Sequence, residues 1–281
     1  MTRAETEALL ANPDLIAIGM KGEEARKAQT GDRVTYGRVL VVSGASGKQD
    51  TSEAGEIRLL DRPASFDEAV SRVREARALA GDLPLTAFSL ADLLALAGND
   101  HLALADASQA LHNAGLESVA EAPLDGLGDT ENAVEVIRAV RHGGLHVWRA
   151  TIDRAAVGSR LDLIERAAII QAETGALRAF APLPRLDPAD TPATGYDDVR
   201  TVAAARLMCA AIPAIQVDWP LYGPKLAQVA IAYGANDIDG IAAVTDPAAG
   251  LRRSPKEEIE RQIRAAGATP AVRNGRYEIF A

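Results

Sequence analysis

The stretch LHVWRATID (145–153), followed by SRLDLIERAAIIQAETG (159–175) and ALRAFAPL (176–183), decides the fold class. The first and third segments read as strands and the second as a helix, an order typical of parallel strands joined by a crossover helix. Six more predicted strands flank this unit: 34–42, 56–60, 83–90, 116–123, 214–220 and 236–244. Because strand and helix alternate six to eight times with short connections, we expect a (β/α)-type barrel rather than an open sheet.

The pattern divides the chain into three parts. Residues 1–30 form a predicted N-terminal helical lead-in, residues 31–250 the barrel, and residues 251–281 a C-terminal helix and tail packed on the barrel. The polar segment SGASGKQDTSEAGE (43–56) leaves little material for a normal second strand–helix unit. We therefore predict a barrel that is partial or irregular near residues 43–63.

Composition excludes several classes of function. The chain has 281 residues, 48% of them hydrophobic and 25% charged, with a formal net charge of −9. A negative balance argues against a broad basic surface for nucleic acid or for an anionic membrane. The sequence shows no apolar run long enough to cross a bilayer and no basic-then-apolar start typical of a signal peptide. We expect a cytoplasmic protein.

The metal-binding residue types are scarce. The one cysteine, Cys209, lies in the alanine-rich segment VRTVAAARLMCAAIP, which predicts a buried and inert thiol. None of the four histidines has the spacing of a metal pair. No GxGxxG follows a predicted strand, so the dinucleotide fingerprint is absent. We expect no metal site.

Polar side chains alternate with apolar ones along the predicted strands. Because successive side chains point to opposite faces, one face of each strand should direct polar groups into the barrel or toward its rim. These groups are Glu121, Arg149, Thr151, Asp153, Arg178, Gln216, Asp218, Asp237 and Asp239. Buried polar groups need partners, so they form either a satisfied ion-pair network or a wet ligand pocket at the carboxyl ends of the strands. We favour the pocket.

In a pocket, these groups would have distinct roles. Arg149 and Arg178 would anchor a carboxylate or phosphate, because a guanidinium binds such groups through two hydrogen bonds. Candidates for the general acid or base are Glu121, Asp153 and Asp218. The other predicted substrate contacts are Thr151, Gln216, Asp237 and Asp239.

Three segments resemble a known enzyme family. They are FAPLPRLDPADT (180–191), QVDWPLYGPKLAQVAIAYGANDIDG (216–240) and SPKEEIERQIRAAGATPAVRNGRY (254–277), which includes Pro270, Arg273 and Tyr277. They are similar to segments of aminofutalosine synthase, a radical S-adenosylmethionine (SAM) enzyme of the futalosine route to menaquinone. The resemblance implies an α/β fold, a TIM-barrel-like barrel of the radical SAM type.

The chain departs from that family where the cofactor would sit. The family's Cys-x-x-x-Cys-x-x-Cys motif corresponds to SGASGKQDTSEAGE, which has no cysteine, and the Gly-Gly-Glu-type SAM contact is missing. An iron–sulfur cluster is held by thiolates. From these departures we expect no cofactor: no [4Fe–4S] cluster and little basis for SAM binding. Radical SAM chemistry by this chain alone would be excluded, and whether it is an enzyme stays open.

Two functions remain in view. The first is a cluster-less paralogue of aminofutalosine synthase that acts as an accessory or metabolite-binding protein in or near menaquinone biosynthesis. Its partners would be a small molecule in the barrel lumen and either a radical SAM homologue or a second copy of itself. The second is a cluster-independent hydrolase or lyase that acts by acid/base chemistry on a carboxylated or nucleoside-like small molecule. A barrel whose inward charges only pair with each other is the third, purely structural, alternative.

Overall fold

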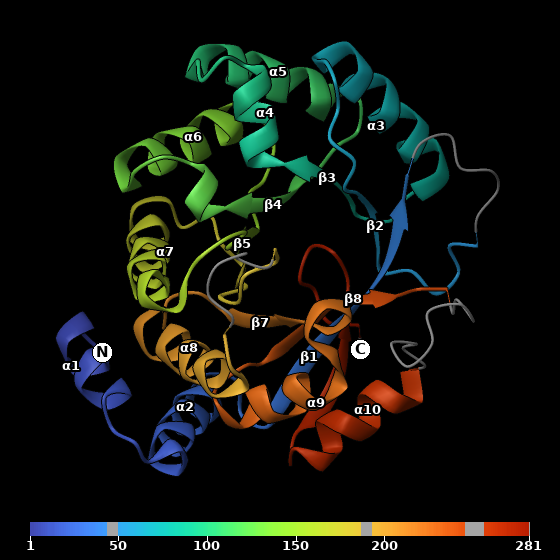
Figure 1. Ribbon diagram of the computed structural model, residues 1–281. Helices are drawn as coiled ribbons and strands as arrows, with labels where there is room; N and C mark the ends of the chain where they lie inside the picture. The colour runs from blue at the N-terminus through green and yellow to red at the C-terminus, as the bar shows by residue number, and fades with distance from the viewer. Residues whose placement is uncertain (44–49, 187–192, 245–255, 281) are drawn as a thin grey trace.

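The computed structural model describes residues 1–43, 50–186, 193–244 and 256–280. Within these residues, parallel strands form a central barrel and helices surround it (Figure 1). The strands are β1 (Arg33–Val42), β2 (Glu56–Leu59), β3 (Leu85–Ser89), β4 (Ser118–Pro123), β5 (Arg149–Thr151), β6 (Ala179–Phe180), β7 (Ala214–Asp218), β8 (Asp237–Ala242) and β9 (Thr269–Arg273). The helices are α1 (Arg3–Leu10), α2 (Leu15–Thr30), α3 (Phe66–Ala80), α4 (Leu90–Leu96), α5 (His101–Asn113), α6 (Thr130–His142), α7 (Arg160–Thr174), α8 (Gly195–Met208), α9 (Trp219–Ala232) and α10 (Lys256–Ala265).

The barrel is closed. Strands β2 to β8 pair in chain order, β8 pairs with β1, and β1 pairs with β2. The expectation of a partial barrel is therefore wrong: the four residues of β2 suffice, because Val39–Val42 of β1 align with all of them. Residues 44–49, within the segment expected to be irregular, lie outside the described residues.

Strand β9 occupies an unexpected place. Residues Arg33–Gly37 of β1 pair with β9, whereas Val39–Val42 pair with β2. Since β8 pairs with β1 over the same stretch, β9 and β2 must share the opposite edge of β1. The sequence pattern predicted only a helix and a tail for residues 251–281, whereas β9 is a strand that pairs with the amino-terminal half of β1.

The helices begin at side chains that accept hydrogen bonds from their first free N–H groups. The predicted cap of α3 is confirmed: Ser65 Oγ accepts from the N–H of Glu68 at 3.2 Å, and Glu68 Oε2 accepts from the N–H of Ala64 at 2.7 Å. Aspartates cap α2, α5, α6 and α9 in the same way. The cap of α9 is Asp218, the last residue of β7, so the helix follows the strand without a loop.

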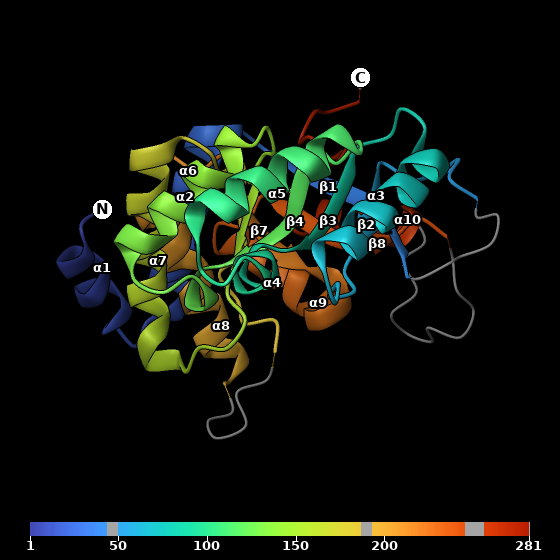
Figure 2. The ribbon, with the colours of Figure 1, turned by 90° about the horizontal axis from the view of Figure 1, so that it is seen from above.

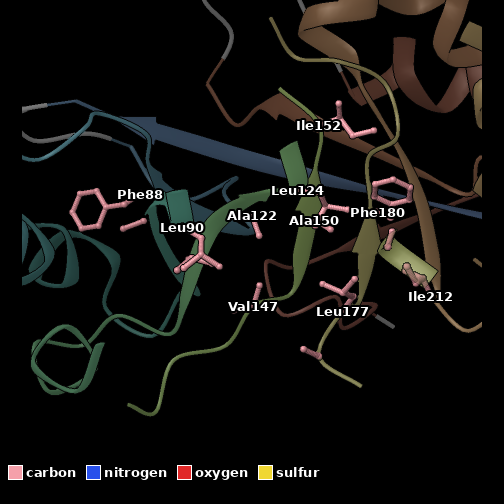
Figure 3. Close-up of a cluster of buried hydrophobic side chains, with 14 of the residues drawn as sticks. Phe88, Leu90, Ala122, Leu124, Val147, Ala150, Ile152, Leu177, Phe180 and Ile212 are labelled. Atoms are coloured by element: carbon pink, nitrogen blue, oxygen red, sulfur yellow. The ribbon is translucent and has the colours of Figure 1, made fainter. Parts of the chain in front are cut away.

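The apolar core lies between the barrel wall and the helices that cover it. Figure 3 shows a cluster of fully buried side chains from the wall and its connections, among them Phe88, Ala150, Ile152 and Phe180. Helices α1 and α2 contact α8, and α1 stands at the periphery in both views (Figures 1 and 2). In the part of the chain that the structure describes, no helix has the length and apolarity needed to span a membrane.

The predicted division into three parts remains a prediction. Helices α1 and α2 fall within the lead-in of residues 1–30, and α10 and β9 fall within the C-terminal part. The predicted boundary at residues 250 and 251 lies outside the described residues. Because β9 pairs with β1, the C-terminal part contributes a strand to the sheet of the barrel.

Candidate ligand site in the barrel lumen

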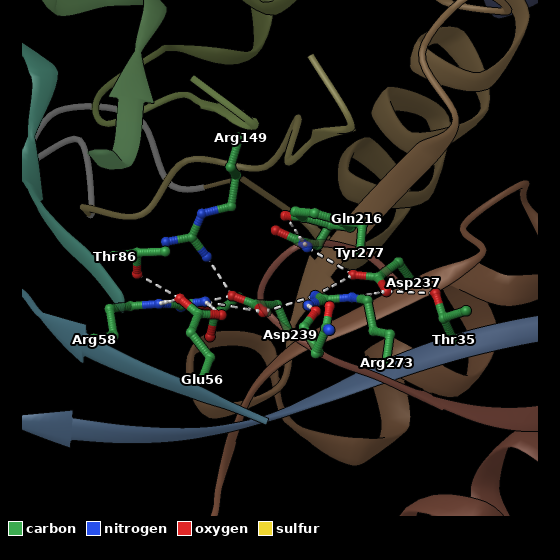
Figure 4. A network of polar contacts seen from close by, with 12 residues as sticks. Thr35, Glu56, Arg58, Thr86, Arg149, Gln216, Asp237, Asp239, Arg273 and Tyr277 are labelled. Atoms are coloured by element: carbon green, nitrogen blue, oxygen red, sulfur yellow. Dashed lines mark hydrogen bonds and ion pairs between the residues drawn. The ribbon is translucent and has the colours of Figure 1, made fainter. Parts of the chain in front are cut away.

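A chain of buried ion pairs crosses the barrel lumen (Figure 4). We call it the Asp239 network; its members are Glu56, Arg58, Thr86, Arg149, Asp237, Asp239 and Arg273. Asp239 accepts from three arginines: Arg58 Nη1 at 2.8 Å, Arg273 Nη2 at 2.9 Å, and Arg149 Nη1. These arginines come from β2, β9 and β5, so one carboxylate of β8 ties together opposite sides of the barrel.

The other carboxylates of the network are paired as well. Arg273 Nε donates to Asp237 Oδ1 at 2.6 Å, and Arg58 Nε donates to Glu56 Oε1 at 2.7 Å. Burial by itself would raise the pKa of the Asp239 carboxyl, but Arg58, Arg149 and Arg273 hold that pKa well below its usual range. Asp239 is therefore ionised, and its charge is balanced within the network.

Gly37 of β1 leaves space for the Arg273 guanidinium because it has no side chain. A Cβ added to Gly37 of β1 would lie 2.6 Å from Arg273 Nη1. A Cβ atom does not pack that closely against another heavy atom, so a side chain at position 37 would displace the Arg273 guanidinium from Asp237 and Asp239.

A second polar group lies where the strands end. We call it the mouth group; its members are Glu121, Thr151, Asp153, Arg185 and Asp218. Arg185 Nε lies 3.2 Å from Glu121 Oε2, and Arg185 Nη1 donates to Asp218 Oδ2 at 3.2 Å. Burial raises the pKa of Asp218, while Arg185 opposes that rise.

Polar atoms in and next to the mouth group lack hydrogen bonds. Among the described residues, Glu121 Oε2, Arg149 Nη2 and Thr151 Oγ1 are buried without a hydrogen bond. Arg185 is near Glu121 Oε2 but not in hydrogen-bonding geometry, and Arg149 Nη2 is 3.8 Å from the same oxygen. A buried polar atom without a partner costs about 1–3 kcal/mol, so these atoms mark a place where a further polar group would be stabilising.

Asp153 is the member of the mouth group whose pKa is raised closest to neutral pH. Burial and the nearby carboxylates of Glu121 and Asp125 raise its pKa to about 6. Asp125 also accepts from the backbone N–H groups of Asp153 and Arg154, at 2.9 and 2.5 Å, which fixes this turn.

Eight of the nine side chains proposed from the sequence lie in the lumen or at its mouth. Arg149, Gln216, Asp237 and Asp239 lie in or against the network, and Glu121, Thr151, Asp153 and Asp218 form most of the mouth group. Arg178 lies elsewhere. Strand β6 begins one residue later, at Ala179, so Arg178 is an exposed residue at the amino end of the barrel. The structure does not bring Arg178 to Arg149.

The lumen also contains charged residues that the sequence analysis did not single out as site residues. Arg185 lies in the proline-rich connection after β6, for which the sequence analysis gave only the family resemblance. Glu56 and Arg58 alternate along β2, and this alternation of charges within a strand was the signal available for them. For Arg273 the only signal was the family resemblance, which gave it no role.

Cys209 is inert, as predicted. It ends α8, is 1% exposed, and its thiol donates to the carbonyl of Ile164 in α7 at 3.4 Å. Burial raises the pKa of this thiol to about 12. No group of three or more His, Cys, Asp or Glu side chains suited to a metal ion occurs among the residues that the structure describes.

Sequence comparisons identify relatives of this chain. Residues 180–281 match the family model described as the CofH/MqnC C-terminal region. The chain is 28% identical to the 5-amino-6-(D-ribitylamino)uracil–L-tyrosine 4-hydroxyphenyl transferase of Methanothermobacter thermautotrophicus, with 94% of this chain and 89% of that protein aligned. It is 32% identical to the aminodeoxyfutalosine synthase of Streptomyces coelicolor over 43% of this chain and 37% of that protein.

Solved structures agree with the barrel. Methylornithine synthase (PylB) superposes with a TM-score of 0.68 at 14% identity, covering 96% of this chain and 94% of that chain. The hydrogenase maturase HydG of Carboxydothermus hydrogenoformans gives a TM-score of 0.68 at 12% identity, covering 96% of this chain and 76% of that chain. The expected TIM-barrel-like fold of the radical SAM type is confirmed.

The comparisons contradict the expectation that this chain has no cofactor. Its homologues and structural neighbours are radical SAM enzymes, which bind a [4Fe–4S] cluster and SAM. The expectation of no cofactor was therefore wrong.

The donor set of this chain differs from the one that holds such a cluster. Thiolates hold iron–sulfur clusters, and the one thiol of the sequence, Cys209, is buried against α7 outside the lumen. The residues present do not fit a cluster held by this chain's own cysteines, and no chemical step below runs through one. Residues 180–281 thus match the CofH/MqnC C-terminal region, and the chain is similar to the archaeal 4-hydroxyphenyl transferase over nearly its whole length and to aminodeoxyfutalosine synthase over less than half of it.

Proposed function

We propose that this chain binds a small carboxylated or nucleoside-like metabolite at the mouth of its barrel. One observation carries the proposal. Three side-chain atoms on the paired strands β4 and β5 are buried without hydrogen bonds: Glu121 Oε2, Arg149 Nη2 and Thr151 Oγ1. The Asp239 network just beside them has its carboxylates paired. A ligand in the mouth would supply the missing partners.

The chemistry of the mouth defines the ligand. Arg149 Nη2 and Arg185 offer N–H donors suited to a carboxylate, and Glu121 and Asp218 offer acceptors suited to hydroxyl or amino groups. A ligand with both kinds of group matches better than a plain anion, because the mouth group holds three carboxylates for one arginine of its own. The names of the relatives include two molecules of this kind, L-tyrosine and aminodeoxyfutalosine, and a third, a ribitylaminouracil, that has the hydroxyl and amino groups without a carboxylate.

The proposed role is that of a metabolite-binding protein near the menaquinone route. It draws on the homology to aminodeoxyfutalosine synthase together with a donor set that does not fit a cluster. In this role the chain would hold a substrate or product for a catalytically complete homologue. Mixing the two proteins and measuring their joint sedimentation tests this part; separate sedimentation with ligand present would contradict it.

The binding proposal is tested by thermal unfolding of the purified protein with a panel of compounds. The panel is L-tyrosine, the ribitylaminouracil, aminodeoxyfutalosine, the carboxyvinyloxy-benzoate precursor and SAM. A ligand at a hundred times its dissociation constant should add about 2.7 kcal/mol of stability. The variant Glu121→Gln should reduce the shift, whereas Glu24→Gln, an exposed residue of α2, should leave it unchanged. Absence of any shift, or equal shifts in both variants, would contradict the proposal.

A second candidate, acid/base catalysis, draws on Asp153. With a pKa of about 6, this carboxyl is ionised above that pH and can accept a proton from a ligand held by the mouth group. A hydrolase or lyase of this kind would gain activity as the pH rises through about 6. Loss of turnover in Asp153→Asn with retained binding supports catalysis; equal turnover in the variant contradicts it.

A further inference from the structure

A second cavity lies at the opposite end of the barrel from the mouth group. Its volume is about 320 Å³, and residues at or before the amino ends of β1, β6, β7 and β8 line it, together with the tail after β9. Arg33, Arg178 and Tyr277 are among these lining residues. In barrels of this type, ligands of the main site bind at the carboxyl ends of the strands, so the mouth group does not account for this cavity.

Two arginines of this cavity have no partner. In the described part of the chain, the side chains of Arg33 and Arg178 make neither a hydrogen bond nor an ion pair, and both are exposed. The other two arginines in the lining are already used. Arg273 belongs to the Asp239 network, and Arg276 Nε donates to Glu117 Oε2 at 2.7 Å.

The charge around the cavity favours an anion. Glu278 is the one carboxylate in the lining, and its Oε2 already accepts from Asn274 Nδ2 at 2.8 Å. The lining therefore holds two arginines without an ion pair, Arg33 and Arg178, against one carboxylate, that of Glu278. Like charges that face the same space repel, and an anion placed there is attracted to both. A guanidinium presents paired donors that match carboxylate and phosphate oxygens.

Tyr277 supplies a third feature. Its φ of 64° places a bulky residue in the left-handed region, a strained conformation of a kind that clusters at functional sites. Its ring lies under the Arg273 guanidinium, 4.3 Å from ring centre to Cζ, and its hydroxyl accepts from Gln216 Nε2 at 3.3 Å. Burial raises the pKa of Tyr277 to about 12, so the phenol keeps its proton and can donate it in a hydrogen bond. Figure 4 shows this side chain beside Gln216, at the end of the network.

We propose that the amino-terminal cavity is a second ligand site that binds a small dianion, with Arg33 and Arg178 as the charged clamp and the Tyr277 hydroxyl as a neutral donor. The volume of about 320 Å³ is near the lower limit for ligand pockets, so a phosphate monoester or a dicarboxylate fits and a nucleotide does not. The site is separate from the mouth group, so its occupant differs from the metabolite proposed above.

Calorimetric titration of the full chain with inorganic phosphate, and separately with succinate, tests the site at constant ionic strength. Saturable binding is expected for at least one of the two, and which one binds distinguishes phosphate from dicarboxylate recognition. Arg33→Gln and Arg178→Gln should each raise the dissociation constant about tenfold, the loss expected from one charge-assisted hydrogen bond. Glu278→Gln should lower the dissociation constant, because this substitution removes a negative charge from the lining of the cavity.

Two controls keep the test decisive. Arg74→Gln removes the same charge from an exposed position on α3 and should leave binding unchanged, as should Glu121→Gln at the mouth. Since the side chains of Arg33 and Arg178 make no hydrogen bond or ion pair within the described residues, their variants should unfold at the wild-type temperature. No saturable binding of either anion, or binding that is equal in wild type and both arginine variants, would overturn the proposal.

Discussion

The Asp239 network and the mouth group lie within one lumen and contain the same residue types, yet they differ in how completely they are paired. Asp239 receives three guanidinium groups, and Asp237 and Glu56 receive one each. In the mouth, Arg185 faces two carboxylates, and Glu121 Oε2 and Thr151 Oγ1 remain without hydrogen bonds. The first alternative raised by the sequence, a network of paired charges, is thus present in the Asp239 network, except at Arg149 Nη2. The mouth group differs from it by its atoms without hydrogen bonds, and the proposed ligand pocket rests on these atoms.

The largest expected effect comes from breaking the network. Asp239→Asn should lower the free energy of unfolding by about 3–5 kcal/mol, because three buried guanidiniums lose their shared counter-charge. The midpoint of urea unfolding measures this. Asp162→Asn removes a carboxylate of the same type from an exposed pair with Arg3 and should cost no more than about 1 kcal/mol. Equal losses in the two variants would show that the network adds nothing beyond a surface ion pair.

The pH dependence of the network has a defined sign. The pKa of Asp239 is lower in the folded than in the unfolded protein, so its stabilising contribution is full above the unfolded-state value near 4. It should be lost as the pH falls below that value toward the folded pKa. Wild type and Asp239→Asn should therefore differ most at neutral pH and converge in acid. A difference in the free energy of unfolding between wild type and Asp239→Asn that stays constant from pH 7 to pH 3 would contradict the lowered pKa of Asp239.

Replacing Asp153 should change the free energy of unfolding less than replacing Asp239, and in the opposite direction. Its folded pKa of about 6 lies above the unfolded value, so the fold disfavours the ionised form and stability falls as the pH rises from about 4 to above 6. Asp153→Asn should therefore be the more stable protein at pH 8, by less than about 1 kcal/mol because water screens this partly exposed group. Thermal unfolding at pH 8 and at pH 4 checks the sign. Destabilisation at pH 8 would instead assign Asp153 to the paired structure.

The smallest effect is expected at Thr151. Replacing it with valine keeps the volume and removes a buried hydroxyl that has no partner, so Thr151→Val should gain a few tenths of a kcal/mol without ligand. With a bound metabolite the wild type should be more stable than Thr151→Val, because only the threonine hydroxyl can form a hydrogen bond with the ligand. The two measurements, unfolding with and without the best compound of the panel, sharpen the contrast between mouth and network. A loss of stability without ligand would show that Thr151 is already satisfied.

The sequence allowed the barrel and most of its inward residues to be predicted, for a physical reason. Strand alternation is local, so Arg149, Gln216, Asp237 and Asp239 could be assigned to the lumen from their own strands. The partners could not, because Arg58 and Asp239 are 181 positions apart and meet only through barrel closure. Arg178 was misplaced because the predicted strand began three residues before the observed one, and alternation has no meaning outside a strand.

The shared edge of β1 has a consequence for how the chain folds. This early strand pairs on one side with β8 and on the other with both β2 and β9, so its partners come from near the start and near the end of the described chain. During synthesis, β1 emerges long before β8 and β9, and most of its edge groups stay unpaired until those strands follow. Contacts of such long sequence separation form slowly, because the entropy of closing the loop is lost before the contact is gained. Closure of the barrel at β1 is therefore expected to be the late and rate-limiting step of folding, and the interval before it is when the chain is most prone to aggregate.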